Sequence, residues 1–150
     1  MSTRPAKGFS VIELLIVMLI MGIMAGVGYA SLRGMLENSK LDSAKAQVAN
    51  SLSWARSYAQ TKNFSASWIK INDTTYKLKL RDKIKIYTLP KGIKFDKTLK
   101  NGTTITYRAP YGEVNINGSN VKPIKIILKS ERGKTAEIHV LGVSGKVIKQ

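Results

Sequence analysis

The sequence predicts an α+β protein in which one long N-terminal helix is followed by small antiparallel β-sheets. Three observations support this expectation. An apolar run opens the chain, helical periodicity continues from it to about residue 62, and short stretches rich in Ile, Val, Tyr and Thr alternate with turn sequences in the remainder. The length of 150 residues allows one globular domain together with an extra element.

The apolar run is long enough to cross a bilayer. Residues 9–32 form a stretch of 24 residues in which Glu13 is the one charged residue. At ~1.5 Å per residue they would form about 36 Å of helix. Residues 1–8 carry Arg4, Lys7 and the amino terminus, and this positive charge places them on the cytoplasmic side. We therefore expect a single membrane span at residues 9–32, with the rest of the chain facing outward.

A cleaved secretory signal is the alternative interpretation of the apolar run. Cleavage would follow a small residue in a small-x-small pattern, such as Ala30 after Gly28. The run is longer than a usual signal core, and helical patterning continues through the supposed cleavage site. Both features favour an intact helix.

The helix should continue beyond the membrane as an amphipathic segment. No proline lies between Pro5 and Pro90, so nothing forces a break, and we expect one helix over residues 9–62. Apolar residues recur at helical spacing among charged and polar ones. These expected core positions are Leu41, Ala44, Val48, Leu52, Ala55 and Ala59.

Residues 63–150 should form the β-rich globular domain. Eight strands are expected, near residues 65–71, 76–80, 84–89, 103–108, 113–116, 124–129, 135–141 and 146–148. The short connection at residues 81–83 indicates a hairpin. One or two small sheets would then pack on the polar half of the helix.

The composition excludes several kinds of chemistry. The chain has no cysteine and one histidine, His139, so disulfides, thiolate nucleophiles and histidine-rich metal sites are not available. Its few carboxylates stand mostly at turns among lysines, which favours solvated ion pairs over an acid–base pair. We expect no enzyme activity, no catalytic residue, no metal and no cofactor.

The charge balance is more informative, with 25 Lys and Arg against 9 Asp and Glu, a net charge of +16 and a pI of about 10.2. Such a charge favours polyanionic partners. Alternation along a strand would place Lys77 and Lys79 on one face, and Lys85 of the next strand would extend them into a cationic strip. The strip is interpreted as a solvated sheet face, a DNA-phosphate groove or a lipid-headgroup contact. The residues considered for DNA are Lys77, Lys79, Arg81, Lys83, Lys85, Arg108, Lys146 and Lys149.

Glu13 needs an explanation, because a carboxylate within a membrane span is costly and normally has a partner or a function. The surrounding sequence Gly-Phe-Ser-Val-Ile-Glu-Leu-Leu, residues 8–15, follows a short basic leader and precedes the apolar run. It resembles the class III signal of type IV prepilins and type II secretion pseudopilins. The resemblance implies that a membrane peptidase cuts after Gly8 and N-methylates Phe9. It also implies that Glu13 meets the amino terminus of a neighbouring subunit, which relieves two desolvation penalties at once.

A second resemblance covers the end of the helix and the C-terminal region. The pattern Leu-x-x-Ala-Arg-x-x-Ala at residues 52–59, and the glycine-containing hairpin at residues 140–147, are similar to those of GspH/FimT-type minor pilins and pseudopilins. This implies a type IV pilin-like fold, a long helix capped by two small sheets. Expected partners are other pilin or pseudopilin subunits, the prepilin peptidase, the inner-membrane assembly platform and the lipid bilayer.

The resemblance places the chain in the bacterial inner membrane, with its globular domain on the periplasmic or extracellular side, and in a filament after assembly. Two functions remain open. One is a structural subunit of a pilus or secretion pseudopilus, and the other is a minor pilin that binds DNA for uptake. In the FimT-like branch basic residues of the C-terminal region contact DNA; Lys146 and Lys149 carry charge there, but the arginines of that pattern are absent.

Overall fold

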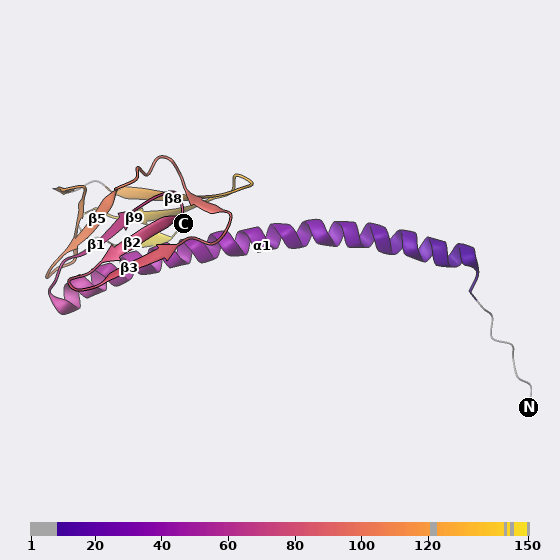
Figure 1. Ribbon diagram of the computed structural model, residues 1–150, viewed down its shortest axis with the longest axis horizontal. Helices are drawn as coiled ribbons and strands as arrows, with labels where there is room; N and C mark the ends of the chain where they lie inside the picture. The colour runs from indigo at the N-terminus through magenta and orange to yellow at the C-terminus, as the bar shows by residue number, and fades with distance from the viewer. Residues whose placement is uncertain (1–8, 121–122, 143, 145, 150) are drawn as a thin grey trace, which may run out of the picture. The chain divides into compact units, whose positions relative to one another are not determined.

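The computed structural model describes residues 9–120, 123–142, 144 and 146–149. One long helix, α1, is followed by short strands that form two sheets (Figure 1). The elements are α1 (Val11–Lys62), β1 (Ala66–Lys70), β2 (Thr75–Lys79), β3 (Ile84–Thr88), β4 (Ile93–Phe95), β5 (Thr104–Arg108), β6 (Glu113–Ile116), β7 (Ser119–Asn120), β8 (Ile124–Ser130), β9 (Thr135–Val140) and β10 (Val147–Lys149). The predicted α+β class is confirmed.

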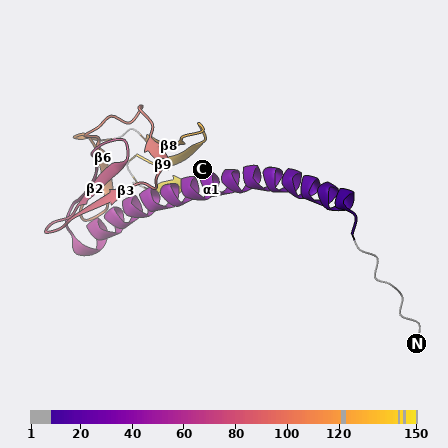
Figure 2. The same cartoon turned by 45° about the vertical axis from the view of Figure 1, so that its right-hand side comes forward.

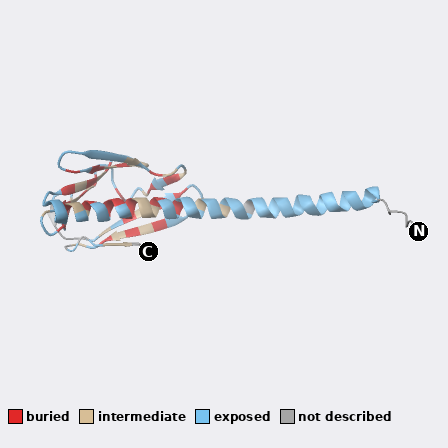
Figure 3. Cartoon of the chain, turned by 90° about the horizontal axis from the view of Figure 1, so that it is seen from below, coloured by how far each residue is buried: buried red, intermediate tan, exposed pale blue. Residues whose placement is uncertain are grey.

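The chain divides into two compact units, Met1–Glu37 and Asn38–Gln150, and the division falls within α1. The second half of the helix therefore belongs to the same unit as the strands. All six apolar positions expected on its inner face are buried: Leu41, Ala44, Val48, Leu52, Ala55 and Ala59. Figure 3 shows this buried face in red on the helix. The helix ends before Asn63, whose φ of 55° is the left-handed conformation common just past a helix C-terminus.

The first sheet is antiparallel, with strand order β3-β2-β1-β5-β6-β7. Its inner face supplies the large aromatic part of the core. Trp68 stacks on Tyr76 at a ring separation of 5.1 Å, and Phe95 meets both rings edge-on. Tyr107 on β5 is also fully buried. Strand β3 forms one edge of this sheet, and Figures 1 and 2 show it beside the C-terminal half of α1.

The second sheet has strand order β10-β9-β8-β4 and is also antiparallel. Its apolar residues complete the same core: Ile93, Phe95, Ile126, Leu128, Ile138 and Val140. Buried residues alternate with half-buried or exposed ones along β8 and β9, as a half-buried sheet requires.

All eight predicted strands form, and their ends differ from the expected ones by at most one residue. Strands β4 and β7 were not predicted. Strand β4 has three residues and offers too short an alternation to identify. Strand β7 has two polar residues and is placed by the turn before it, where Asn117 and Gly118 have φ of 49° and 86°. Two consecutive positive φ angles define the type I′ hairpin turn that Asn-Gly favours.

Candidate assembly segment and cationic surface

The described part of the N-terminal segment begins with Phe9, which is exposed. Gly8, the expected cleavage position, lies outside the described residues. Helix α1 starts at Val11, and the Ser10 carbonyl accepts hydrogen bonds from the amides of Glu13 and Leu14 at 3.1 and 3.2 Å. Glu13 therefore lies in the first helical turn, where the helix dipole favours a negative charge.

The Glu13 side chain is exposed within the single chain. Among the described residues of this chain, no cation lies within ion-pair distance of its carboxylate. The neighbouring positions of the same helix are mostly apolar, so among the described residues of this chain nothing offers a counter-charge to the Glu13 carboxylate in a membrane.

The first half of α1 exposes an almost wholly apolar surface. Its most apolar window of 18 residues has a mean hydropathy of 2.5, and none of that window is buried within the protein. By length and composition this helix can cross a membrane. Near the end of the apolar run the guanidinium of Arg33 lies 4.5 Å from the centre of the Tyr29 ring. An aromatic residue beside a cation is typical of a membrane–water interface.

The expected cationic strip does not form as predicted. Lys77 and Lys79 do share the outer face of the first sheet, opposite the buried Tyr76 and Leu78. Lys85, however, pairs directly with Leu78 across β2 and β3. Directly opposed residues of an antiparallel pair project to the same face, so Lys85 lies on the helix side of the sheet.

The reason for this error is the two-residue connection at Arg81 and Asp82. The Leu80 amide donates to the Lys83 carbonyl at 2.8 Å, which fixes a register in which odd-numbered residues of β2 oppose even-numbered residues of β3. Ile84 and Ile86 consequently lie on the outer face with Lys77 and Lys79. The outer face is thus a mixed apolar and cationic surface.

The other candidate cations are dispersed. The Arg81 guanidinium lies 3.9 Å from the centre of the Phe64 ring, and its Nε lies 3.8 Å from Asp82 Oδ1. Arg108 is exposed on the outer face, where its cross-strand neighbour is Glu113. Lys146 belongs to the turn before β10, in the second sheet, and its carbonyl accepts from the Leu141 amide. The side chain of Lys149 lies outside the described residues.

Two hollows flank Lys85 between α1 and β3. The Lys85 Nζ lies 4.7 Å from the centre of the half-exposed Trp54 ring, and both residues line both hollows. The larger, of about 500 Å³, is also lined by Gln47, Asn50, Ser51 and Tyr87. The smaller, of about 270 Å³, is also lined by Tyr58, Leu80, Asp82 and Lys83. Sequence reasoning missed this arrangement because it depends on the register of β3.

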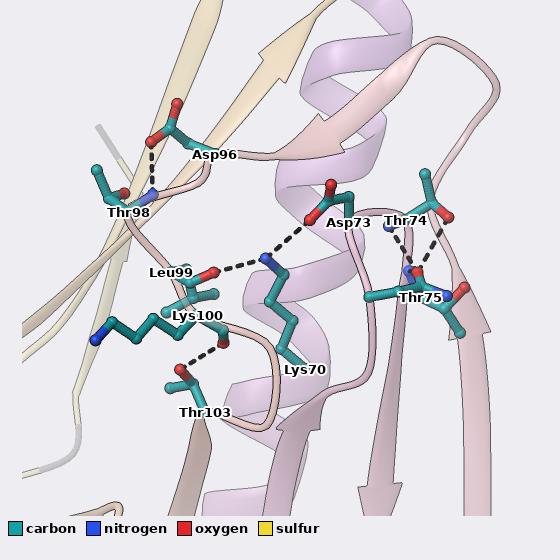
Figure 4. Close-up of polar contacts among 10 residues, drawn as sticks. Lys70, Asp73, Thr74, Thr75, Asp96, Thr98, Leu99, Lys100 and Thr103 are labelled. Carbon is teal, nitrogen blue, oxygen red and sulfur yellow. Dashed lines mark hydrogen bonds and ion pairs between the residues drawn. The ribbon is translucent and has the colours of Figure 1, made fainter.

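Sequence reasoning also missed Lys70, which is almost fully buried. Figure 4 shows its ammonium donating to the Leu99 carbonyl at 2.6 Å and to Asp73 Oδ1 at 3.2 Å. These bonds tie the loop after β4 to the end of β1. Strand alternation places Lys70 on the same inner face as Ala66 and Trp68, and that pattern was the available signal.

A surface ion pair on the second sheet joins Glu137 to Lys125. Glu137 Oε1 lies 2.7 Å from Lys125 Nζ, and this hydrogen bond, with a smaller contribution from His139, lowers the pKa of the Glu137 carboxyl. His139 Nε2 is 3.4 Å from Glu137 Oε2. Within the described residues, no three or more His, Asp or Glu side chains are grouped to hold a metal ion.

Comparison with known proteins supports the class that the fold and the first segment define. A family model described as the prokaryotic N-terminal methylation motif matches residues 3–29. No curated protein and no solved structure shows a significant match to the chain. The motif supports a type IV prepilin-like protein, and a long helix whose second half packs on antiparallel sheets is consistent with a type IV pilin-like fold. The motif indicates a structural subunit that is processed by a prepilin peptidase and assembles with other pilins.

Proposed function

We propose that this chain is a minor pilin or pseudopilin of the GspH/FimT type, a structural subunit of a type IV pilus or type II secretion pseudopilus. The observation that carries the proposal is the methylation motif at the start of a helix whose first half is apolar and unburied. The second half of that helix is covered by two small sheets. A helix with these two halves can anchor in the inner membrane and later pack against the same helix of other subunits.

In this role the leader, residues 1–8, remains in the cytoplasm and the globular domain faces the periplasm. The peptidase cuts between Gly8 and Phe9 and methylates the new amino terminus. Glu13 then pairs with the amino group of Phe9 of a neighbouring subunit. Its carboxylate has no cationic partner among the described residues of its own chain, which supports pairing with another one.

Replacement of Glu13 by alanine tests this proposal at the assembly step. The Glu13→Ala helix is more apolar and should still insert in the membrane. We expect it to be processed normally and to be depleted from sheared surface filaments recovered with co-expressed subunits. Glu13→Asp, which keeps the charge on a shorter side chain, is the matched control and should recover part of the incorporation. Equal incorporation of Glu13→Ala and the unchanged protein would contradict the pairing.

A second candidate function, DNA binding by a competence pilus subunit, is favoured by the net charge of +16 and by the exposed cations of the β2–β3 hairpin. Phosphate contact would make such binding weak, independent of sequence and steeply dependent on salt. Reversal of Lys77 and Lys79 to glutamate should abolish a gel shift, whereas reversal of the exposed Lys94 and Lys97 should only weaken it. Reversal of Lys146 and Lys149 tests the C-terminal alternative. Equal losses of DNA binding in all three variants would indicate that DNA is attracted by the net charge alone and not by a particular site.

A further inference from the structure

The free edge of β3 carries unpaired backbone groups. In an antiparallel pair, every second residue of a strand is hydrogen-bonded to its partner strand. The Leu80 amide donates to the Lys83 carbonyl, and the Leu89 amide donates to the Thr74 carbonyl. These two bonds show that the odd-numbered residues of β3 are the ones bonded to β2. Lys83, Lys85 and Tyr87 therefore bond to β2. The amides and carbonyls of Ile84 and Ile86 point away from the sheet.

The helix closes one end of this edge and leaves the other end open. Gln47 Nε2 donates to the Thr88 carbonyl at 3.2 Å, so the Thr88 end is occupied. Ile84 and Ile86 are 60% and 66% exposed, and among the described residues no hydrogen bond is made to their outward backbone groups. An open edge with exposed β-branched residues is a template for another strand.

The two faces of β3 differ in chemistry. Ile84 and Ile86 form an apolar outer face, while Lys85 lines both hollows beside Trp54 and Lys83 lines the smaller one. Among the described residues, no carboxylate lies within ion-pair distance of either lysine. Asp82 lines the smaller hollow, but its nearest cation is Arg81. The helix side of the edge therefore has an excess of positive charge.

We propose that the free edge of β3 binds an extended acidic segment of a partner protein, which adds to the first sheet as a further strand. Its apolar side chains alternate with carboxylates. The apolar side chains lie beside Ile84 and Ile86, and the carboxylates enter the hollows on either side of Lys85. Backbone hydrogen bonds supply affinity and the alternation supplies specificity, as in other cases of strand addition. A second copy of this chain is a poor occupant, because two chains of charge +16 repel each other.

The experiment uses the full chain in detergent micelles and a short synthetic peptide of alternating valine and glutamate, with a valine and lysine peptide as control. Three variants are compared. Ile86→Pro removes an outward amide and leaves the β2 ladder intact, because that amide makes no ladder bond. Lys85→Glu reverses the charge on the helix side. Lys94→Glu is the matched control, an exposed lysine at the centre of edge strand β4, whose neighbours Ile93 and Phe95 are buried.

The acidic peptide should bind, and the lysine peptide should not. Ile86→Pro and Lys85→Glu should each weaken binding by about tenfold or more, and Lys94→Glu by about twofold or less. Hydrogen exchange gives a second readout that does not rest on a variant. On addition of the acidic peptide, the amides of Ile84 and Ile86 should become protected, since those of Lys85 and Tyr87 are already bonded to β2.

Three results would overturn the proposal. One is the absence of peptide binding or of new protection at Ile84 and Ile86. Another is an equal loss in Lys85→Glu and Lys94→Glu with no effect of Ile86→Pro, which would show simple charge attraction. The third is displacement of the peptide by duplex DNA, with DNA binding that requires Lys85 but is unaffected by Ile86→Pro. This result would assign the surface to nucleic acid. None of these results bears on processing at Gly8 or on Glu13.

Discussion

At the scale of single residues, Tyr107 carries a buried hydroxyl that forms no hydrogen bond with any described residue. A buried polar group without a partner costs about 1–3 kcal/mol. Tyr107→Phe removes the hydroxyl and keeps the ring, so we expect the variant to be as stable as the unchanged protein or more stable by about 1 kcal/mol at neutral pH. Urea unfolding of the detergent-solubilised chain measures this. A loss of stability would indicate an ordered water that satisfies the hydroxyl.

The same tyrosine predicts a pH dependence. Burial raises the pKa of Tyr107 above its ordinary value, and the nearby Arg56 charge offsets only part of the rise. The folded protein therefore holds this proton more tightly than the unfolded chain does. The stability that comes from this difference in proton binding is fully present below about pH 10, where the unfolded tyrosine is also protonated. It is lost as the pH rises above that value. Unfolding curves at alkaline pH should show that Tyr107→Phe loses less stability than the unchanged protein does. An equal loss of stability in the two proteins would contradict the burial of the Tyr107 hydroxyl.

Lys70 stabilises the loop after β4 through its ammonium. Lys70→Met keeps most of the side chain but leaves the Leu99 carbonyl without its donor, while the half-exposed Asp73 can be hydrated. We expect a loss of about 1–3 kcal/mol in the free energy of unfolding. Lys77→Met, on the outer face of the same sheet, should change stability by less than about 0.5 kcal/mol. Equal effects of the two substitutions would mean that the buried bonds contribute little.

At the scale of elements, the turn between β5 and β6 depends on Gly112. Its φ is 71°, and a Cβ at this position would lie 3.0 Å from Arg56 Cγ and 3.1 Å from Gln60 Cγ on α1. Gly112→Ala should therefore cost about 1–3 kcal/mol of stability, from backbone strain and crowding together. Gly133→Ala is the matched control, since its φ of 85° imposes strain but a Cβ there meets nothing within 4 Å. If the two variants lose equal stability, the helix side chains move aside freely.

The elements themselves could be predicted from sequence far better than their faces. The helix and eight strands follow from periodicity and turn residues, because those signals are local. The orientation of Lys85 could not be predicted in the same way, since it depends on how many residues connect β2 and β3. A shift of one residue in register moves every side chain of a strand to the other face. The hollows beside Trp54 and the mixed outer face both result from that register.

At the scale of the whole molecule, the segment after the membrane span should fold without it. Every buried apolar residue among those described lies at Leu41 or beyond, within the unit Asn38–Gln150. We expect a fragment that begins at Leu36 to unfold cooperatively, with a melting temperature that chelator does not lower. Circular dichroism during heating measures both. A large drop on chelation would reveal a metal site formed by backbone carbonyls and scattered carboxylates, and a fragment without cooperative unfolding would show that the apolar half is needed for folding.

The methylation motif could be recognised from sequence, because it is a linear pattern. The hollows beside Lys85 could not, because they form where α1 and β3 meet after folding. Lys70 shows the same limit in a single residue: strand alternation could have assigned it to the inner face, but only the position of the Leu99 carbonyl explains how its charge is accommodated.

The most direct test of the prepilin assignment is the amino terminus of the mature protein. Mass spectrometry of membrane-extracted protein, expressed with its prepilin peptidase, should find a chain that begins with N-methylated Phe9 and has lost residues 1–8. A bulky replacement of Gly8 should leave the uncut precursor in the membrane. An amino terminus near Ser31 would instead show secretory-signal cleavage after Ala30, and would contradict both the processing and the membrane-anchored assembly proposed for this chain.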